Sequence, residues 1–398
     1  MTKDRLHNET RALCRALIRT PSRSGEEGEA AAVLKQTMTR LGYDDVMTDT
    51  NGSVIGRIRG NRPGPAVLFD GHIDTVPVNE PALWTHDPFG AEEADGQIYG
   101  RGASDMKGAV AAMTVAAAAF KEQTGGDFPG TVYVAGVVYE ELFEGVACRT
   151  ISELVKPDTV VIGESTQLRL NIGQRGRAEL VVETRGRSVH SANPEKGVNA
   201  VRLMTRFLNR LEERYVPEER AMLGRGIMEL TDIVSSPFPG SSVLPETCTA
   251  TFDRRLLTGE TEESVLAPVN AILDELHAED PAFLGRAYFR AQSLGCYTGG
   301  TVSAKRFFPA WLFPREAPFN RAALSALRAA GLEPEISAYS FCTNGSHYAG
   351  EKGIRTLGFG PSREDLAHTV DEYIALDQLY AAADGYLALA GALTDPSL

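Results

Sequence analysis

The chain has 398 residues, more than one hydrophobic core usually supports, so we expect two domains. A hydrophobic content of 43% and a charged content of 23% are ordinary for a globular protein. The net charge of −13 argues against nucleic acid or an anionic membrane surface as a partner.

The first ~175 residues alternate between helix-like and strand-like segments. Helical periodicity or composition predicts helices at 3–19, 25–41 and 107–121, and short apolar runs predict strands at 53–59, 66–70, 131–139 and 159–162. Strands that alternate with helices are typical of an α/β sheet with helices on both faces.

The pattern changes near residue 177, where 178–184 alternates polar and apolar residues as a half-exposed strand does. Further strands are predicted near 227–234 and 247–254, and helices near 197–213 and 262–278. The resulting β-α-β-β-α-β order indicates a ferredoxin-like α+β insert with helices on one face of its sheet.

The α/β pattern returns after about residue 300, with helices at 319–330 and 374–392 and a strand at 356–359. We therefore predict one discontinuous catalytic domain with a mixed sheet and flanking helices, formed by residues 1–176 and 296–398. The inserted smaller domain covers residues 177–295.

Residues 68–76 are the most informative stretch, because His72 and Asp74 come directly after the apolar strand 66–70. Ligands and catalytic groups collect at this end of the strands in open α/β sheets. An imidazole next to a carboxylate suits one metal ligand and the group that orients it. This signal is weak alone, so its meaning depends on the residues that lie just beyond the other strands.

Further acidic and histidine residues also lie just after strands or open a helix. They are Asp105 in a Gly-rich turn before the Ala-rich helix, Glu140 and Glu141 after strand 131–139, Glu164 after strand 159–162, and His368 after strand 356–359. Each has an ordinary explanation when taken singly. Asp105 could be a helix N-cap, and the glutamate pair could lie in a solvated loop.

Taken together, these residues predict a site for divalent cations. So many carboxylates at one edge of a sheet would repel one another unless cations neutralise them. Imidazole and carboxylate ligands without a thiolate suit Zn²⁺, and Co²⁺ or Mn²⁺ are also possible. A carboxylate can bridge two ions, and in the pair Glu140–Glu141 one can bind metal while the other serves as a base for metal-activated water.

These motifs resemble those of the M20 metallopeptidases, a family that includes acetylornithine deacetylases, succinyl-diaminopimelate desuccinylases, aminoacylases and glutamate carboxypeptidases. The matching segments are in family order and span 66–372: Gly71–Val76, Gly100–Gly108, Glu140–Glu141, Gly163–Glu164 and Gly360–Pro361 with His368. Further segments look most like a bacterial hydrolase subgroup linked by name to selenium metabolism: Gln174–Glu179, Ser235–Pro237, Asp253–Leu256 and Thr343–Gly345.

The resemblance implies a role for each metal ligand. His72 and Glu164 would hold metal on separate ions, Asp105 would bridge the two ions, and Glu141 and His368 would complete the pair.

The resemblance also implies how the remaining groups act. Asp74 would support His72, and Glu140 would be the general base. The insert would be a dimerisation or lid domain, and His190 would match a lid histidine that reaches the active site of the partner subunit in a homodimer.

Two departures from the family pattern leave the substrate open. Ser242 stands where desuccinylases carry Asn, and Asn344 stands where many relatives have Asp. We expect Asn344 to lie near the bound substrate. Arg175 and Arg255 could each clamp a substrate carboxylate bidentately, although a salt bridge is nearly as good an explanation for either.

The N-terminus and the cysteines predict a cytoplasmic location. The first seven residues contain no apolar stretch of the kind that secretory signals have, and no apolar run reaches the ~18 residues of a membrane span. The five cysteines are scattered without a CxxC pair, which is typical of reduced thiols.

We therefore predict a two-metal, zinc-type amidohydrolase that cleaves an N-acyl group from a small amino-acid-like substrate. A dipeptidase or carboxypeptidase of the same family is the alternative. A non-catalytic binding protein is a third hypothesis, but such a protein would be expected to lose the base or a ligand, and all are present.

Overall fold

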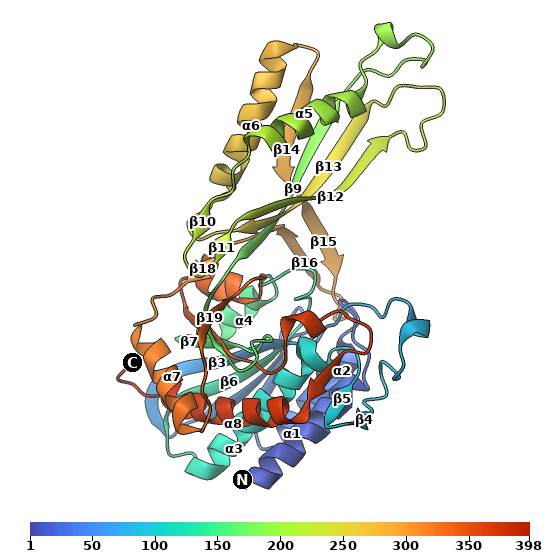
Figure 1. Ribbon diagram of the computed structural model, residues 1–398. Coiled ribbons are helices and arrows are strands. Elements are labelled where there is room, and N and C mark those ends of the chain that lie inside the picture. Colours follow the sequence, from blue (N-terminus) through green and yellow to red (C-terminus); the bar gives the residue numbers. More distant parts are fainter. The chain divides into compact units, whose positions relative to one another are not determined.

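The computed structural model describes all residues, 1–398, and divides them into two compact units (Figure 1). Unit 1 comprises Met1–Gln174, Ser293–Ala304 and Trp311–Leu398, and unit 2 comprises Arg175–Gln292 and Lys305–Ala310. The segment Lys305–Ala310, which the sequence analysis placed in the catalytic domain, thus belongs to unit 2. None of the helices is long and apolar enough to cross a bilayer.

A nine-stranded mixed sheet forms the centre of unit 1, in the order β1-β2-β6-β3-β7-β20-β8-β18, with β19 paired to β8. Strand β3 (Arg62–His72) runs parallel to β6 (Pro129–Val137) and β7 (Thr159–Ile162), and β20 (Arg355–Gly358) runs parallel to β7. Because these four strands end at one edge of the sheet, the residues just after them come together there. The other strands are β1 (Asp45–Thr48), β2 (Val54–Arg59), β8 (Leu170–Gln174), β18 (Trp311–Leu312) and β19 (Ile336–Tyr339).

Helices cover both faces of this sheet, as the sequence predicted. They are α1 (Lys3–Ile18), α2 (Gly28–Arg40), α3 (Gly108–Thr124), α4 (Cys148–Val155), α7 (Pro318–Ala329) and α8 (Leu376–Leu393). Gly71 of β3 faces Val110 of α3, whereas its neighbour Asp70 contacts Cys148 of α4. Successive strand residues point to opposite faces, so α3 and α4 lie on opposite sides. Helix α3 is apolar all round and buried from Gly108 to Phe120, and α1 and α8 pack on it.

Unit 2 contains an antiparallel sheet in the order β12-β13-β9-β14, covered on one face by two helices. Its elements are β9 (Gly176–Arg185), α5 (Ala200–Arg214), β12 (Ile227–Ser236), β13 (Thr247–Leu256), α6 (Glu262–Glu279) and β14 (Leu284–Phe289), and β17 (Phe307–Phe308) pairs with β9. The apolar residues of β9 and β13 that face the helices form a core with α5 and α6. This β-α-β-β-α-β arrangement confirms the ferredoxin-like insert.

A hairpin of β15 (Ala291–Gly295) and β16 (Thr301–Lys305) returns the chain to unit 1. The Tyr297 ring at its tip packs on Gly28 and Gly52, and a Cβ at Gly52 would lie 2.2 Å from a ring atom. The Tyr297 hydroxyl donates a hydrogen bond to the carbonyl of Gly52 (2.8 Å). Small residues at these positions therefore form the socket for the hairpin. The remaining short strands are β4 (Glu93–Ala94), β5 (Gln97–Tyr99), β10 (Glu219–Arg220), β11 (Gly224–Arg225) and β21 (Tyr373–Ala375).

Candidate metal centre

His72 is the last residue of β3, and its ring is buried with 1% of its surface exposed. The ring atom Nδ1 lies 2.8 Å from the backbone carbonyl oxygen of Asp74. A carbonyl can only accept a hydrogen bond, so Nδ1 carries a proton, and in the neutral ring Nε2 is the nitrogen that has the lone pair. The local backbone thus prepares Nε2 of His72 as a ligand.

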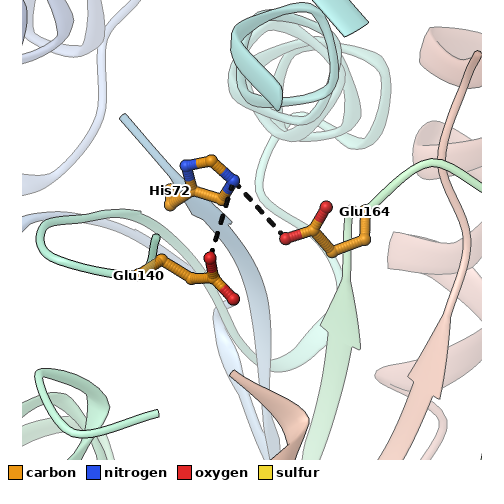
Figure 2. A group of neighbouring side chains, drawn as sticks. All are labelled: His72, Glu140 and Glu164. Atoms are coloured by element: carbon orange, nitrogen blue, oxygen red, sulfur yellow. Dashed lines mark ion pairs between the residues drawn. The ribbon is translucent and has the colours of Figure 1, made fainter. Parts of the chain in front are cut away.

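Three carboxylates surround Nε2 of His72, two of which are drawn in Figure 2. Oδ1 of Asp105 lies at 2.9 Å, Oε1 of Glu164 at 3.5 Å and Oε2 of Glu140 at 4.0 Å from this nitrogen. Glu164 lies just after β7 and Glu140 just after β6, as the sequence predicted for residues at the ends of parallel strands.

A second histidine lies on the other side of Asp105. Nε2 of His368 is 3.1 Å from Oδ2 of Asp105 and 3.0 Å from Oε2 of Glu141. Each oxygen of the Asp105 carboxylate therefore faces a different histidine. The resemblance implied that His72 and Glu164 serve separate ions, but the structure groups His72 with Glu164 and His368 with Glu141.

Asp105 does not cap the helix that comes after it. It lies within a π-helical turn, Ala103–Lys107, with non-helical backbone angles, and the N-cap of α3 is Lys107. Gly102, just before this turn, adopts a φ of 85°, which glycine tolerates best. This conformation turns the Asp105 side chain toward the two histidines, so the ordinary N-cap explanation is wrong.

The Asp74 carboxylate binds the main chain of the pair Glu140–Glu141. Its Oδ1 accepts a hydrogen bond from the backbone N–H of Glu140 (3.1 Å), and its Oδ2 accepts one from that of Glu141 (3.2 Å). Oδ2 also accepts a hydrogen bond from the Ser24 hydroxyl at 2.7 Å. Asp74 is fully buried and so fixes the positions from which both glutamates extend. Sequence reasoning missed this contact, because Asp74 and the pair are far apart in the chain.

The carboxylates and imidazoles of this cluster change one another's pKa values. Burial raises the pKa of Glu140 and of Glu164 well above the usual range, and neighbouring carboxylates raise it further. Burial opposes protonation of His72, but the hydrogen bond with Asp105 and nearby carboxylates still raise its pKa well above its ordinary value. Hydrogen bonds with Asp105 and Glu141 raise the pKa of His368 to about 10.

These residues fit divalent cations. Ligand atoms of His72, Glu140 and Glu164 lie within 4.8 Å of one another, and so do those of His72, Asp105 and Glu141. In the protein alone, protons on imidazole and carboxyl groups offset the mutual repulsion of the buried carboxylates. A divalent cation offsets the same repulsion more strongly, and the nitrogen and oxygen donors suit zinc-like ions.

Asn344, which was predicted to bind substrate, is buried in the interior of unit 1. Asn344 is only 3% exposed; its Nδ2 donates to Asp70 (2.9 Å), and its Oδ1 accepts from the Gly145 backbone (2.8 Å). The Asn344 side chain therefore braces the interior of unit 1, which argues against substrate binding.

The predicted substrate arginines lie in unit 2. The Nε of Arg255 pairs with Asp253 at 2.8 Å, and the Nε of Arg175 donates to the Leu223 carbonyl at 2.6 Å. Each guanidinium has further N–H donors beyond these contacts.

His190 is exposed in a loop of unit 2, beside Val243 of the neighbouring loop. Its Nδ1 accepts a hydrogen bond from the backbone N–H of Ala192 (3.0 Å). The ring proton of the neutral form is therefore on Nε2, which leaves Nε2–H as a donor.

The sequence matches the profile of a family described as "Peptidase family M20/M25/M40" over residues 68–392. It is 32% identical over 402 residues to the uncharacterised Escherichia coli K12 protein YgeY, covering 97% of this chain and 94% of that protein. It is 31% identical over 284 residues to a succinyl-diaminopimelate desuccinylase of Cereibacter sphaeroides, covering 69% of this chain and 74% of that enzyme.

The fold is similar to that of the Bacillus subtilis protein YXEP, a dinuclear metal-binding peptidase of the M20 family, with a TM-score of 0.73 at 14% identity. That match covers 99% of both chains. The family match, over most of the chain, confirms the resemblance seen in the sequence motifs. The chain therefore belongs to peptidase family M20/M25/M40 and is a metal-dependent hydrolase of amide or peptide bonds.

Proposed function

We propose that the protein is a two-ion amidohydrolase that removes an N-acyl group from a small amino-acid-like substrate. The observation that carries this proposal is the placement of His72 and His368 on opposite oxygens of Asp105. A single carboxylate between two nitrogen ligands can be shared by a pair of cations, each of which is also held by one of the nitrogens.

The ligands divide naturally into two sets. His72, Asp105 and Glu164 would hold one ion, and Asp105, Glu141 and His368 would hold the other. When bound, the ions act as Lewis acids that polarise the scissile carbonyl and lower the pKa of water in the site. Zn²⁺ suits the donors best, with Co²⁺ or Mn²⁺ as alternatives.

Glu140 is the proposed general base. It lies farther from Nε2 of His72 (4.0 Å) than Asp105 or Glu164 does, so both ligand sets are complete without it. The hydrogen bond from its backbone to Asp74 keeps it beside the ligands. From there its carboxylate can take a proton from water and deliver it to the leaving amine.

A homodimer formed through unit 2 is part of the proposal. Strand β12 is an edge strand of ten residues, and the apolar side chains of Leu230, Ile233 and Val234 are 38%, 49% and 48% exposed. A long apolar edge of this kind pairs readily with a second copy of itself.

In such a dimer, we propose that His190 acts on the partner's substrate. The free Nε2–H of its neutral ring can donate a hydrogen bond to an oxygen on which negative charge develops. Its position in an exposed loop supports this, because no contact in unit 2 occupies that donor.

The N-acyl amino acid is favoured over a peptide as substrate by the similarity to a desuccinylase across 69% of the chain. Arg175 and Arg255 are proposed to bind its carboxylate through the N–H groups that their present partners leave available. The alternative remains a dipeptide or a peptide with a free carboxyl end. The cytoplasmic location stays a prediction.

The test is hydrolysis by metal-free protein reconstituted separately with Zn²⁺, Co²⁺ and Mn²⁺. N-acetyl, N-succinyl and N-carbamoyl amino acids would be compared with dipeptides, and Glu140→Gln protein would serve as the blank for contaminating hydrolases. Preference for an N-acyl substrate supports the proposal, whereas preference for dipeptides supports the alternative. Absence of hydrolysis with all three metals would contradict both.

A further inference from the structure

A buried carboxylate outside the predicted ligand set joins the two segments that carry Asp105 and His368. Glu372 lies four positions after His368 and has no exposed surface. A buried carboxylate is costly unless its oxygens are fully bonded, so its partners show what holds it in place.

Both oxygens of Glu372 bind the turn that carries Asp105. Oε1 accepts hydrogen bonds from the backbone N–H groups of Ser104 (2.9 Å) and Asp105 (3.1 Å). Oε2 forms an ion pair with Nη1 of Arg101 at 2.5 Å. The turn at 100–105 is therefore held by one side chain from a segment more than 260 residues away.

The main chain reinforces this connection. The backbone carbonyl of Glu372 accepts a hydrogen bond from the N–H of Gly100 (2.8 Å), and the Ser104 hydroxyl donates to the carbonyl of Tyr373 (2.5 Å). Strand β21, which begins at Tyr373, then pairs with β5 just before the turn. Main-chain hydrogen bonds thus connect the two segments at Glu372 and at the residues that follow it.

Glu372 also supplies the carboxylate that compensates the buried charge of Arg101. Arg101 is 4% exposed and lies over the Trp84 ring, 5.2 Å from its centroid. A buried guanidinium needs a nearby carboxylate, so removal of Glu372 would leave it uncompensated.

We propose that Glu372 is a positioning residue that sets the separation of the two ion sites. It fixes the Asp105 main chain to the segment that carries His368, so that the shared carboxylate faces both histidines at once. This inference rests on the proposed two-ion function. Groups that orient metal ligands typically change metal affinity or activity by about 10–100-fold when they are lost.

The test compares Glu372→Ala with Arg101→Met/Glu372→Gln. The double variant removes both buried charges but keeps an amide oxygen that can accept the Asp105 N–H. Glu364→Ala, an exposed glutamate in the same loop, is the matched control. Ion binding to metal-free protein would be measured by titration calorimetry, and kcat and KM by substrate turnover.

For Glu372→Ala we expect binding of one ion to weaken about 10–100-fold and kcat to fall similarly, with KM within about twofold. The double variant should recover a large part of both losses, and the control should behave as wild type. If Glu372→Ala does not fold, the test uses the double variant alone. Wild-type ion binding by the double variant would support a role for the acceptor oxygen at position 372. Loss of ion binding by the double variant would overturn the proposal. Wild-type ion binding and kcat in folded Glu372→Ala would also overturn the proposal.

Hydrogen exchange of the peptide that covers residues 100–107, in metal-free protein, separates this inference from the two-ion function. We expect faster exchange there in Glu372→Ala and no change in Glu364→Ala. Fewer than two ions in the wild type would refute the two-ion function even if this exchange changes. Unchanged exchange would refute the positioning role even if wild type binds two ions.

Discussion

Nε2 of His368 lies 3.0 Å from Oε2 of Glu141, although 227 residues separate the two in the chain. His368 comes after β20 and Glu141 after β6, and these strands are not neighbours in the sheet. The contact exists because parallel strands deliver the residues after them to one edge. One of the two proposed ion sites therefore needs the C-terminal part of unit 1 to be folded.

Removal of either histidine should remove one ion. We expect His368→Ala to retain about one ion per chain instead of two, since Asp105 and Glu141 alone leave that ion with too few ligands. Metal content after dialysis would be measured by mass spectrometry, with circular dichroism to verify folding. His277→Ala, whose ring contacts the Phe283 carbonyl within unit 2, is the control. Two tightly held ions in His368→Ala would remove His368 from the ligand set.

Replacement of the proposed base should separate chemistry from metal binding. Glu140→Gln is expected to keep both ions and its fold while turnover falls by about two to four orders of magnitude. The reason is that Gln cannot take a proton from water, although it preserves the shape of the side chain. Glu153→Gln, an exposed position on α4, should turn over at the wild-type rate. Normal turnover in Glu140→Gln would assign the base elsewhere.

A mixed dimer tests whether His190 acts on the partner subunit. His190→Ala should be nearly inactive because the loss of one such hydrogen-bond donor costs about 10²–10³ in turnover. Glu140→Ala should be nearly inactive because it lacks the proposed base. When they are co-expressed, one hybrid site contains both wild-type groups, so about a quarter of wild-type activity should return. Activity that stays at the level of the separate variants, despite demonstrated mixed dimers, would show that His190 does not act in trans.

The exposed edge of β12 should control association. Ile233→Lys places a charge on an apolar edge position that is 49% exposed and is expected to convert a dimer into a monomer. Light scattering coupled to gel filtration would report the mass. Leu154→Lys, an equally apolar and 57% exposed position on α4, should leave the mass unchanged. A dimer that survives Ile233→Lys would place the interface elsewhere.

The ion pairs of Glu351 with His347 and Arg149 should make stability depend on pH at the acidic end. Burial raises the pKa of Glu351, but hydrogen bonds with His347 (2.6 Å) and Arg149 outweigh this effect and lower it to about 2. Since the folded-state pKa is below the unfolded value of 4.5, the stabilisation is complete above that pH and is lost as pH falls toward 2.

Glu351→Gln should therefore lower the free energy of unfolding by roughly 1 kcal/mol at neutral pH, because solvent screens the ion pairs of this partly exposed carboxylate. The difference from wild type should shrink below about pH 4.5. Urea unfolding at several pH values measures this difference. Glu153→Gln, the exposed position on α4, should show little difference at any pH. A gap that persists unchanged to about pH 3 would contradict the assigned cause.

The sequence was sufficient for the elements that place His72 and Glu164, because each residue ends or adjoins a short apolar run with a clear pattern. The ferredoxin-like order of unit 2 could also be predicted, since its strands alternate between polar and apolar residues. Helix α4 and the strands β8 and β19 were not predicted. They are only eight, five and four residues long, so their patterns are too short to distinguish them from loops.

The environment of Asn344 could not be predicted for a different reason. Its partner Asp70 lies 274 positions away, and nothing local distinguishes an amide that braces the interior from one that binds a ligand. Glu372 was missed in the same way, because its role depends on backbone N–H groups of the turn at 100–105. Contacts of side chains with a distant main chain leave no pattern in the sequence.

Because the Tyr297 ring packs on Gly28 and Gly52, the insert cannot simply be expressed alone with its hairpin intact. A fragment of residues 175–310 would carry a hairpin whose tip has lost its glycine socket, and the exposed ring would invite aggregation. The backbone of Arg306 donates to the carbonyl of Arg290 at 2.7 Å, so the two arms of the hairpin are adjacent at its base. A short turn in place of 293–304 can therefore join them, and the insert becomes a separate polypeptide whose folding can be measured without the metal-binding sheet.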